Sequence, residues 1–218
     1  MMDSGVEWIG VVPEGWRVER IKRVAKMESG HTPYRQNEEY WIDCNIPWVS
    51  LNDTKYLKNH DYISDTLHQI SELGMANSSA HLLPTGAVIF TRDATIGLAA
   101  ITTRPMAVSQ HIIAWLCGPN MLPEYLLFTF YAMTQDLDRL TMGSTIKTIG
   151  MSEVYELVTP VPPIIEQEKI VKHVFYQKDA IDKIVAKIKE SNRIHQEYRS
   201  ALISAAVTGK IDVRQEAA

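Results

Sequence analysis

The stretch PVPPIIEQEKIV, residues 160–171, decides how the chain is divided. Its two adjacent prolines end any preceding strand, because proline lacks the backbone N–H that regular structure needs. From Ile164 to Thr208 the chain then contains neither glycine nor proline. Prolines and acidic residues at the start, with Gly209 beyond the far end, are the signals that begin and end a helix. The sequence therefore predicts one helix about 67 Å long.

An apolar seam runs along this predicted helix. Alternate steps of four and three residues from Ile170 meet mostly apolar side chains, and charged residues fill the other faces, as in a coiled coil. The seam positions are Ile170, Val174, Gln177, Ile181, Ile184, Ile188, Ser191, His195, Tyr198, Leu202 and Ala205. A single amphipathic helix cannot bury such a seam, so it packs either on its own domain or on another chain. Its length favours another chain.

Residues 1–160 have the pattern of a mixed α/β domain with short strands and many turns. The predicted strands are 88–91, 98–102 and 111–116, with Gly97 in the turn between the first two. The other predicted elements are a strand running into a short helix over 16–27 and a buried helix over 123–133. We therefore predict an α+β fold: a globular domain over 1–160, and over 161–218 one long C-terminal helix that forms an antiparallel coiled coil.

The composition of the 218 residues, 45% hydrophobic and 22% charged, suits a globular domain with an additional element. No apolar run approaches the roughly 18 residues of a membrane span, and the first residues do not resemble a signal peptide. Cys44 and Cys117 are far apart and form no CxxC motif, which indicates neither a disulfide framework nor a zinc site. We expect a cytoplasmic protein with no membrane partner.

The net charge of −4 counts against a generic nucleic-acid binder, which would be basic. Residues 1–160 carry 12 Lys and Arg against 18 Asp and Glu, whereas residues 161–218 carry 10 against 8. Binding of DNA by the first segment must therefore depend on local patches of positive charge.

Motifs of catalysis are not evident in the sequence. The segment around Gly209 and Lys210 lacks the spaced glycine of a P-loop, and neither HExxH nor GxSxG occurs. Asp53 and Lys55 are weak evidence for a metal-dependent nuclease, which we keep as a remote alternative. The sequence predicts a binding protein rather than an enzyme, with no catalytic residue, metal ligand or cofactor.

Three polar, turn-rich segments, 29–37, 91–97 and 143–148, are candidate DNA contacts. Arginine suits guanine, Asn and Gln suit adenine, and small hydroxyl groups beside a lysine suit phosphate. The predicted contacts are Thr32, Tyr34, Arg35, Gln36, Asn37, Arg92, Asp93, Thr95, Ser144, Thr145 and Lys147. The alternative for each segment is an ordinary surface turn, in which Arg92 and Asp93 pair only with their neighbours.

A short basic run is the other candidate for a DNA contact. Arg17 and Lys22 are its predicted contacts to a duplex backbone, although Glu19 and Glu28 dilute the positive charge. The five tryptophans are better explained by packing than by stacking on bases.

The order of several short motifs resembles the DNA-specificity subunit of type I restriction–modification enzymes. The motifs are Trp8-Ile9-Gly10, Pro13, Trp16, Gly30-His31-Thr32-Pro33, Tyr40-Trp41, Ile46-Pro47-Trp48-Val49-Ser50, Asp53, Ser78-Ser79-Ala80, Leu83-Pro84, Gly86, Ile96-Gly97, Ser109-Gln110, Gly143-Ser144-Thr145, Pro162-Pro163, Glu166-Gln167, Ile170, Tyr198-Arg199-Ser200-Ala201-Leu202-Ile203 and Ala206-Val207-Thr208-Gly209-Lys210-Ile211. Each motif is loose, but their joint order is specific and extends over essentially the whole chain.

The resemblance implies a target-recognition domain followed by a conserved-region helix, with no active site. Subunits of this family usually carry two such domains and two antiparallel helices, which hold the domains apart so that each reads half of a split double-stranded DNA target. They dock methyltransferase (M) subunits, which methylate adenine, and restriction (R) subunits, which use ATP. This sequence has one domain and one helix, so it is either a half-length subunit that dimerises or a fragment of a longer one.

The seam favours a half-length subunit that dimerises. An antiparallel pairing centred near Ile188 matches Ile170 with Ala205 and Gln177 with Tyr198, and closes as a twofold dimer. The predicted dimerisation residues are Ile170, Val174, Ile181, Ile184, Ile188, Tyr198 and Leu202. Two copies would read identical half-sites in opposite orientation, hence an interrupted palindrome. The alternative function is a scaffold protein that oligomerises through the coiled coil and binds no DNA.

Overall fold

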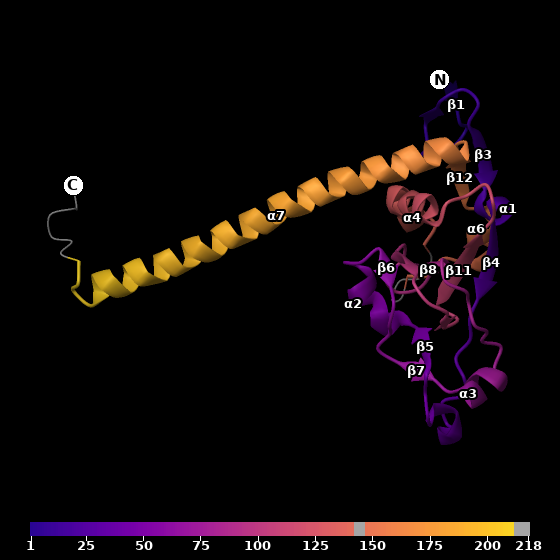
Figure 1. Cartoon of the computed structure of the whole chain (residues 1–218), viewed down its shortest axis with the longest axis horizontal. Helices are drawn as coiled ribbons and strands as arrows, with labels where there is room; N and C mark the ends of the chain where they lie inside the picture. Colours follow the sequence, from indigo (N-terminus) through magenta and orange to yellow (C-terminus); the bar gives the residue numbers. More distant parts are fainter. Residues whose placement is uncertain (142–146, 212–218) are drawn as a thin grey trace. The chain divides into compact units, whose positions relative to one another are not determined.

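The structure, a computed structural model, describes residues 1–141 and 147–211 (Figure 1). The chain divides into two compact units, Met1–Ile170 and Val171–Ala218. Within the described ranges, no helix combines the length and the apolarity that crossing a bilayer requires.

A five-stranded sheet forms the centre of the first unit, in the order β4–β11–β8–β9–β6. Its strands are β4 (Ala25–Ser29), β6 (Tyr62–Ile63), β8 (Val88–Thr91), β9 (Ala99–Thr102) and β11 (Ile112–Cys117). The β6–β9 pair is parallel and the other pairs are antiparallel. The three strands predicted from sequence are confirmed to within one residue at each end. Every residue of β8 and β9 is buried, because both faces of the sheet are covered.

Different elements cover the two faces of this sheet. Helix α4 (Pro123–Ala132), predicted from its starting proline, lies against β8 and β9. The rings of Phe90 and Phe130 stack there with centroids 4.8 Å apart. Because side chains alternate along a strand, Ile89 points to the other face, where it joins a core that includes Val49 and Met106.

A second sheet of three short strands, in the order β10–β5–β7, contributes to that core. The elements of this part are η1 (Glu38–Trp41), β5 (Ile46–Val49), η2 (Leu51–Asp53), α2 (Thr54–Leu57), β7 (Gln69–Ile70), α3 (Glu72–Ala76) and β10 (Ala107–Val108). In Figure 1, β5 and β7 are labelled near α2 and α3 in the lower part of the first unit.

The remaining elements of the first unit come from the beginning of the chain and from the residues between α4 and the long helix. They are β1 (Met2–Asp3), β2 (Val11–Val12), β3 (Arg17–Arg20), α1 (Ile21–Val24), α5 (Thr134–Arg139), α6 (Met151–Glu156) and β12 (Val158–Val161). Strand β3 pairs antiparallel with β12, so that Arg17 faces Val161. The predicted strand-into-helix over 16–27 is confirmed as β3 and α1 up to Val24, whereas residues 25–27 belong to β4 because they pair with β11.

The long C-terminal helix is also confirmed. Helix α7 (Ile164–Val207) runs unbroken for 44 residues (Figure 1). It begins directly after the proline pair, and Gly209 beyond its end has a φ of +71°. Along the predicted seam, Ile181, Ile184 and Ile188 are 57%, 58% and 54% exposed. The antiparallel pairing that would cover them stays a prediction.

Candidate nucleic-acid interface

Two of the three predicted contact segments emerge at one end of the central sheet. Strand β11 pairs with β4 so that Ile113 faces Ser29, and with β8 so that Ile112 faces Thr91. The segment after Ser29 and the turn after Thr91 therefore leave the sheet at the same end. That end also holds the 109–111 turn, which enters β11.

A chain of side-chain hydrogen bonds joins these segments. The Thr32 hydroxyl donates to Gln110 Oε1, and Gln110 Nε2 lies 3.2 Å from His111 Nε2. On the other side of the imidazole ring, His111 Nδ1 lies 2.6 Å from Asp93 Oδ2. Because a carboxylate oxygen accepts, the His111 Nδ1–H donates to Asp93, and Nε2 faces the side-chain amide of Gln110. The chain fixes the segment around Thr32 relative to the β8–β9 turn.

The third predicted segment joins the same cluster through its last residues. The Thr148 hydroxyl donates to Asp93 Oδ1, and the Ala94 N–H donates to the Lys147 carbonyl at 2.9 Å. Lys147 itself is exposed, and its ammonium lies 3.6 Å from Asp138. Ser144 and Thr145 lie outside the described residues. The described residues of all three predicted segments thus meet at one end of the sheet.

Burial separates the residues that position these loops from those that face solvent. Asp93 is only 7% exposed, and both its carboxylate oxygens are engaged by His111 and Thr148. Arg92 is half-buried, with Nε 3.7 Å from Asp93 Oδ1, and Thr95 is exposed in the turn. The geometry suits Asp93 to positioning the loops and Thr95 to contact with a ligand.

The loop over residues 31–37, which we call the reading loop, has its own local order. Asn37 accepts a hydrogen bond from the Glu39 N–H at 3.2 Å and so caps η1, as Asn at this position commonly does. The Tyr34 hydroxyl donates to Gln36 Oε1 at 2.6 Å, which leaves the amide nitrogen of Gln36 available. Arg35 and Gln36, both exposed, are therefore the members of this loop best able to meet a base or a phosphate, whereas the Thr32 hydroxyl is already engaged by Gln110.

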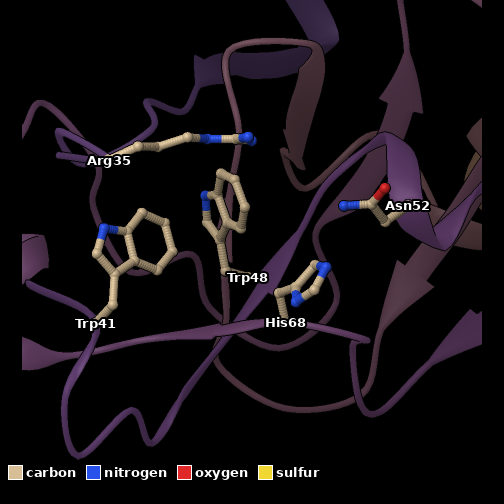
Figure 2. A pocket seen from close by; sticks show the side chains of 5 residues that line it. All are labelled: Arg35, Trp41, Trp48, Asn52 and His68. Atoms are coloured by element: carbon tan, nitrogen blue, oxygen red, sulfur yellow. The ribbon is translucent and has the colours of Figure 1, made fainter. Parts of the chain in front are cut away.

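A pocket of ≈ 280 Å³ opens beside the reading loop, lined by Arg35, Trp41, Trp48, Asn52 and His68 (Figure 2). The two indole rings meet edge to face, with centroids 5.9 Å apart. Their N–H groups donate to carbonyls of the segment that begins at His31: Trp48 to His31 at 3.2 Å, and Trp41 to Tyr34 at 3.4 Å. The tryptophans therefore hold the loop in place as well as forming the pocket wall.

Free positive charge is concentrated in the same region. Most lysines and arginines in the described residues 1–163 lie within 4.0 Å of a carboxylate. The cations of this range without a carboxylate partner are Arg35, Lys55 and Lys58. Arg35 lines the pocket. Lys55 lines a neighbouring cavity of ≈ 620 Å³ that shares Asn52 with it. An acidic domain thus presents two unpaired cations, Arg35 and Lys55, at adjoining cavities beside its reading loop.

The structure does not bring Arg17 and Lys22 to this region. Strand β4 separates them from the reading loop, because Ala25 faces Cys117 and Ser29 faces Ile113 at opposite ends of β11. Arg17 lies 3.9 Å from Glu19, and Lys22 lies 3.9 Å from Glu156. Each must leave a carboxylate before it can bind a phosphate, so both stay predicted contacts of a separate patch.

Asp53, which the sequence offers for a nuclease site, has a structural role. Asp53 is buried and accepts hydrogen bonds from the Ser50 and Leu67 N–H groups at 2.9 and 2.8 Å, the first as part of a capping box. Among the described residues, no three His, Cys, Asp or Glu side chains gather as a metal ion would need. Burial, with a smaller contribution from Glu124, raises the pKa of Cys117 to about 12, so this thiol stays neutral.

Comparison with known proteins gives the family of the chain. Residues 13–192 match the type I restriction modification DNA specificity domain. The chain belongs to this family. The MjaIX specificity subunit of Methanocaldococcus jannaschii is 31% identical over 178 residues, which are 80% of this chain and 40% of the relative. The HindI specificity subunit of Haemophilus influenzae is 27% identical, over 92% of this chain and 42% of the relative. The chain thus spans less than half the length of these curated relatives.

Solved structures share the fold of this specificity domain. An HsdS subunit from Thermoanaerobacter tengcongensis matches with a TM-score of 0.60 at 19% identity, over 84% of this chain and 41% of that one. A chain from a structural study of complex assembly and conformational transition in the type I R-M system matches with a TM-score of 0.71 at 17% identity, over 90% and 47%.

Sequence reasoning about this specificity domain missed several residues of the interface. The sequence marks Gln110 only as part of a family motif, and His111 only as the first residue of a predicted strand. Asn52 and His68 carried no signal, because each is a single polar residue in a short irregular segment. A histidine directly before a buried strand, at the end of the sheet where other polar loops emerge, is the signal that could have identified His111.

Proposed function

We propose that this chain is the DNA-recognition subunit of a type I restriction–modification system and reads one half of a bipartite target. It has no active site of its own in this proposal. It positions adenine methyltransferase and restriction subunits on DNA and, because its target is genomic DNA, acts in the cytoplasm.

The observation that carries the proposal is the joining of three polar loops at one end of the sheet in a chain of the specificity-domain family. A reader of base sequence needs side-chain donors and acceptors held in fixed relative positions. The hydrogen bonds that link Thr32 to Thr148 through Gln110, His111 and Asp93 supply such fixed positions. The unpaired cation of Arg35 lines the pocket beside them.

The two segments of the chain have separate roles in this proposal. Residues 1–160 recognise DNA, and the segment over residues 161–218, which contains α7, acts as a spacer, docks the methyltransferase subunits and pairs with a second copy. Ile181, Ile184 and Ile188 are each more than half exposed, and these apolar side chains support such pairing. An antiparallel homodimer centred near Ile188 would place two recognition domains on half-sites of opposite orientation.

Selection from random DNA duplexes tests the proposal. The purified chain is incubated with the pool in the presence and absence of the cognate methyltransferase subunit, and bound duplexes are sequenced. We expect enrichment of an interrupted, symmetric motif when the methyltransferase is present. A pool without any enriched sequence under both conditions would support the scaffold protein instead.

Single substitutions in the loops connect that result to the interface. Arg35→Ala and Lys147→Ala remove exposed cations, so they should weaken binding of the selected duplex while leaving the melting temperature unchanged. Arg104→Ala is the matched control, because Arg104 follows β9 at the opposite end of the sheet and is also exposed. Loss of folding in either loop variant would indicate that these residues belong to structural turns.

A further inference from the structure

The pocket beside the reading loop has the chemistry of a site for a planar ring. We propose that it holds one unstacked nucleobase of the bound DNA, an inference that rests on the proposed function. Its volume of ≈ 280 Å³ is near the lower end of small-molecule sites, which begin at about 300 Å³, so it suits a single ring system.

The wall of the pocket offers aromatic surface. The indole N–H groups of Trp41 and Trp48 are already bonded to backbone carbonyls, so neither is a free donor. Trp48 is only 2% exposed and packs in a core cluster beneath the pocket, so the half-buried ring of Trp41 is the aromatic surface open to a base. Figure 2 shows the two indoles next to each other, with the Arg35 side chain extended across the same opening. Stacking of a base on an aromatic side chain contributes about 1–3 kcal/mol, which offsets the cost of removing that base from its helix.

Polar groups stand where the edge of a base would need partners. Among the described residues, nothing engages the side chains of Arg35, Asn52 and His68 by a hydrogen bond or an ion pair. An amide, an imidazole and a guanidinium together supply both donors and acceptors, which are the groups that recognise base edges. In Figure 2 the Asn52 and His68 side chains lie on the other side of Trp48 from Trp41.

The surrounding charges favour a base carried on a DNA strand over a free nucleotide. Lys55 and Lys58, the other unpaired cations, belong to α2 and its end, so they are placed for phosphates that flank the base. Glu38 and Glu39 are exposed on η1, directly after the reading loop, and they disfavour a compact, highly charged phosphate group close to Arg35. We therefore assign the pocket to a base within a polynucleotide.

Indole signals in nuclear magnetic resonance test this occupant directly. The ¹⁵N-labelled full chain has five tryptophans and hence five indole N–H signals. Trp41→Phe and Trp48→Phe identify the two signals of the pocket. The probes are a short duplex with one unpaired adenine, the same duplex fully paired, deoxyadenosine monophosphate, and inorganic phosphate at equal ionic strength.

We expect the duplex with the unpaired adenine to shift the Trp41 and Trp48 signals with an affinity about tenfold higher than that of the paired duplex, a difference of about 1.4 kcal/mol. Asn52→Ala combined with His68→Ala should lower that affinity about tenfold. Asn45→Ala, an exposed amide outside the pocket, should leave it unchanged. Melting temperatures equal to that of the wild type establish that the variants fold.

Three results would overturn the inference: pocket signals that do not move, equal affinity for both duplexes, or monophosphate binding as tight as the duplex with the unpaired base. The last would make the pocket a site for free nucleotides. The duplex selection described above has a separate readout. If the selection enriches a motif but the Trp41 and Trp48 signals do not shift, the nucleobase pocket is refuted and the DNA-recognition function is not. If the selection enriches no motif, the DNA-recognition function is refuted.

Discussion

At the scale of single residues, Gly30 fixes the position of the reading loop. A Cβ on this residue would lie 1.6 Å from the carbonyl oxygen of Val108, much closer than atoms can approach. Glycine therefore allows the end of β4 to run directly over the backbone of β10. That close approach brings Thr32 within reach of Gln110, and it starts the hydrogen-bonded chain that joins the loops.

Gly30→Ala should destabilise the first unit by about 3 kcal/mol, since the obstructing atoms belong to the backbone and cannot rotate away. The measurement is the free energy of unfolding from urea titration. Ser29→Ala is the control, because Ser29 is exposed at the neighbouring position and a methyl group fits there. Equal stability of the two variants would show that the backbone at Gly30 has room for a methyl group beside Val108.

Single residues also show how much of the interface could be predicted. Thr32, Arg35 and Asp93 were predicted from polar composition in turn-rich segments, and the structure places all three at one end of the sheet. The composition did not predict their different roles, because the burial of Asp93 depends on His111 and Thr148, which are distant in sequence. Local composition identifies polar loops, whereas the pairing of strands decides which loops meet.

Among the elements, the first turn of α7 is held by one buried amide. Gln167 is 0% exposed; its Nε2 donates to the carbonyls of Asn120 and Pro162, and its Oε1 accepts from the Leu122 N–H, all at 2.9 Å. These bonds satisfy backbone groups of the segment before α4 and of the segment before α7. The side chain therefore ties the beginning of the helix to the first unit.

Gln167→Ala should lower the free energy of unfolding of the first unit by about 3 kcal/mol, because it leaves buried backbone groups without partners, at about 1–3 kcal/mol each. Hydrogen exchange at the Leu122 amide should also become faster. Lys169→Ala, at an exposed position of the same helix, is the control. An unchanged exchange rate at Leu122 would contradict the assigned bond.

Elements with a strong local pattern were predicted, and those set by distant pairing were not. The sequence shows apolar runs in β8 and β11, and in α7 it shows apolar residues that recur every three or four positions along the whole helix. Strand β4 has the sequence AKMES, in which Ala25 and Met27 alternate with Lys26 and Glu28, but two apolar residues are too few to distinguish a strand from the predicted helix; it is a strand because β11 pairs with it. Two-residue strands such as β7 and β10 are too short to carry any period.

For the whole molecule, charge predicts how DNA binding should respond to salt. Residues 1–160 carry 12 basic against 18 acidic residues, so cations without carboxylate partners can bind phosphates at the lowest cost. Each phosphate contact contributes about −0.9 to the slope of log K against log salt concentration. Lys55→Ala with Lys58→Ala should therefore make that slope less negative by about 1.8 per chain.

The control for the salt dependence is Arg17→Ala with Lys22→Ala, measured on the same selected duplex. These two cations already have carboxylate partners, so their loss should change the slope by much less. Equal changes from the two pairs would show that the separate basic patch also binds the DNA backbone, as the sequence predicts. The comparison therefore assigns the phosphate contacts to one patch or to both.

The exposed seam of α7 makes the last prediction, which concerns the number of chains in the assembly. Ile184→Asp combined with Ile188→Asp places two carboxylates where the proposed antiparallel partner packs, and burying unpaired charges there is strongly unfavourable. Light scattering should then report the mass of one chain, against two for the wild type. Ala186→Asp with Ser200→Asp adds the same charge off the seam, so it should remain dimeric. A wild type that is already monomeric would show that the chain does not pair with a second copy by itself. A double Ile variant that stays dimeric would show that a different surface pairs the chains.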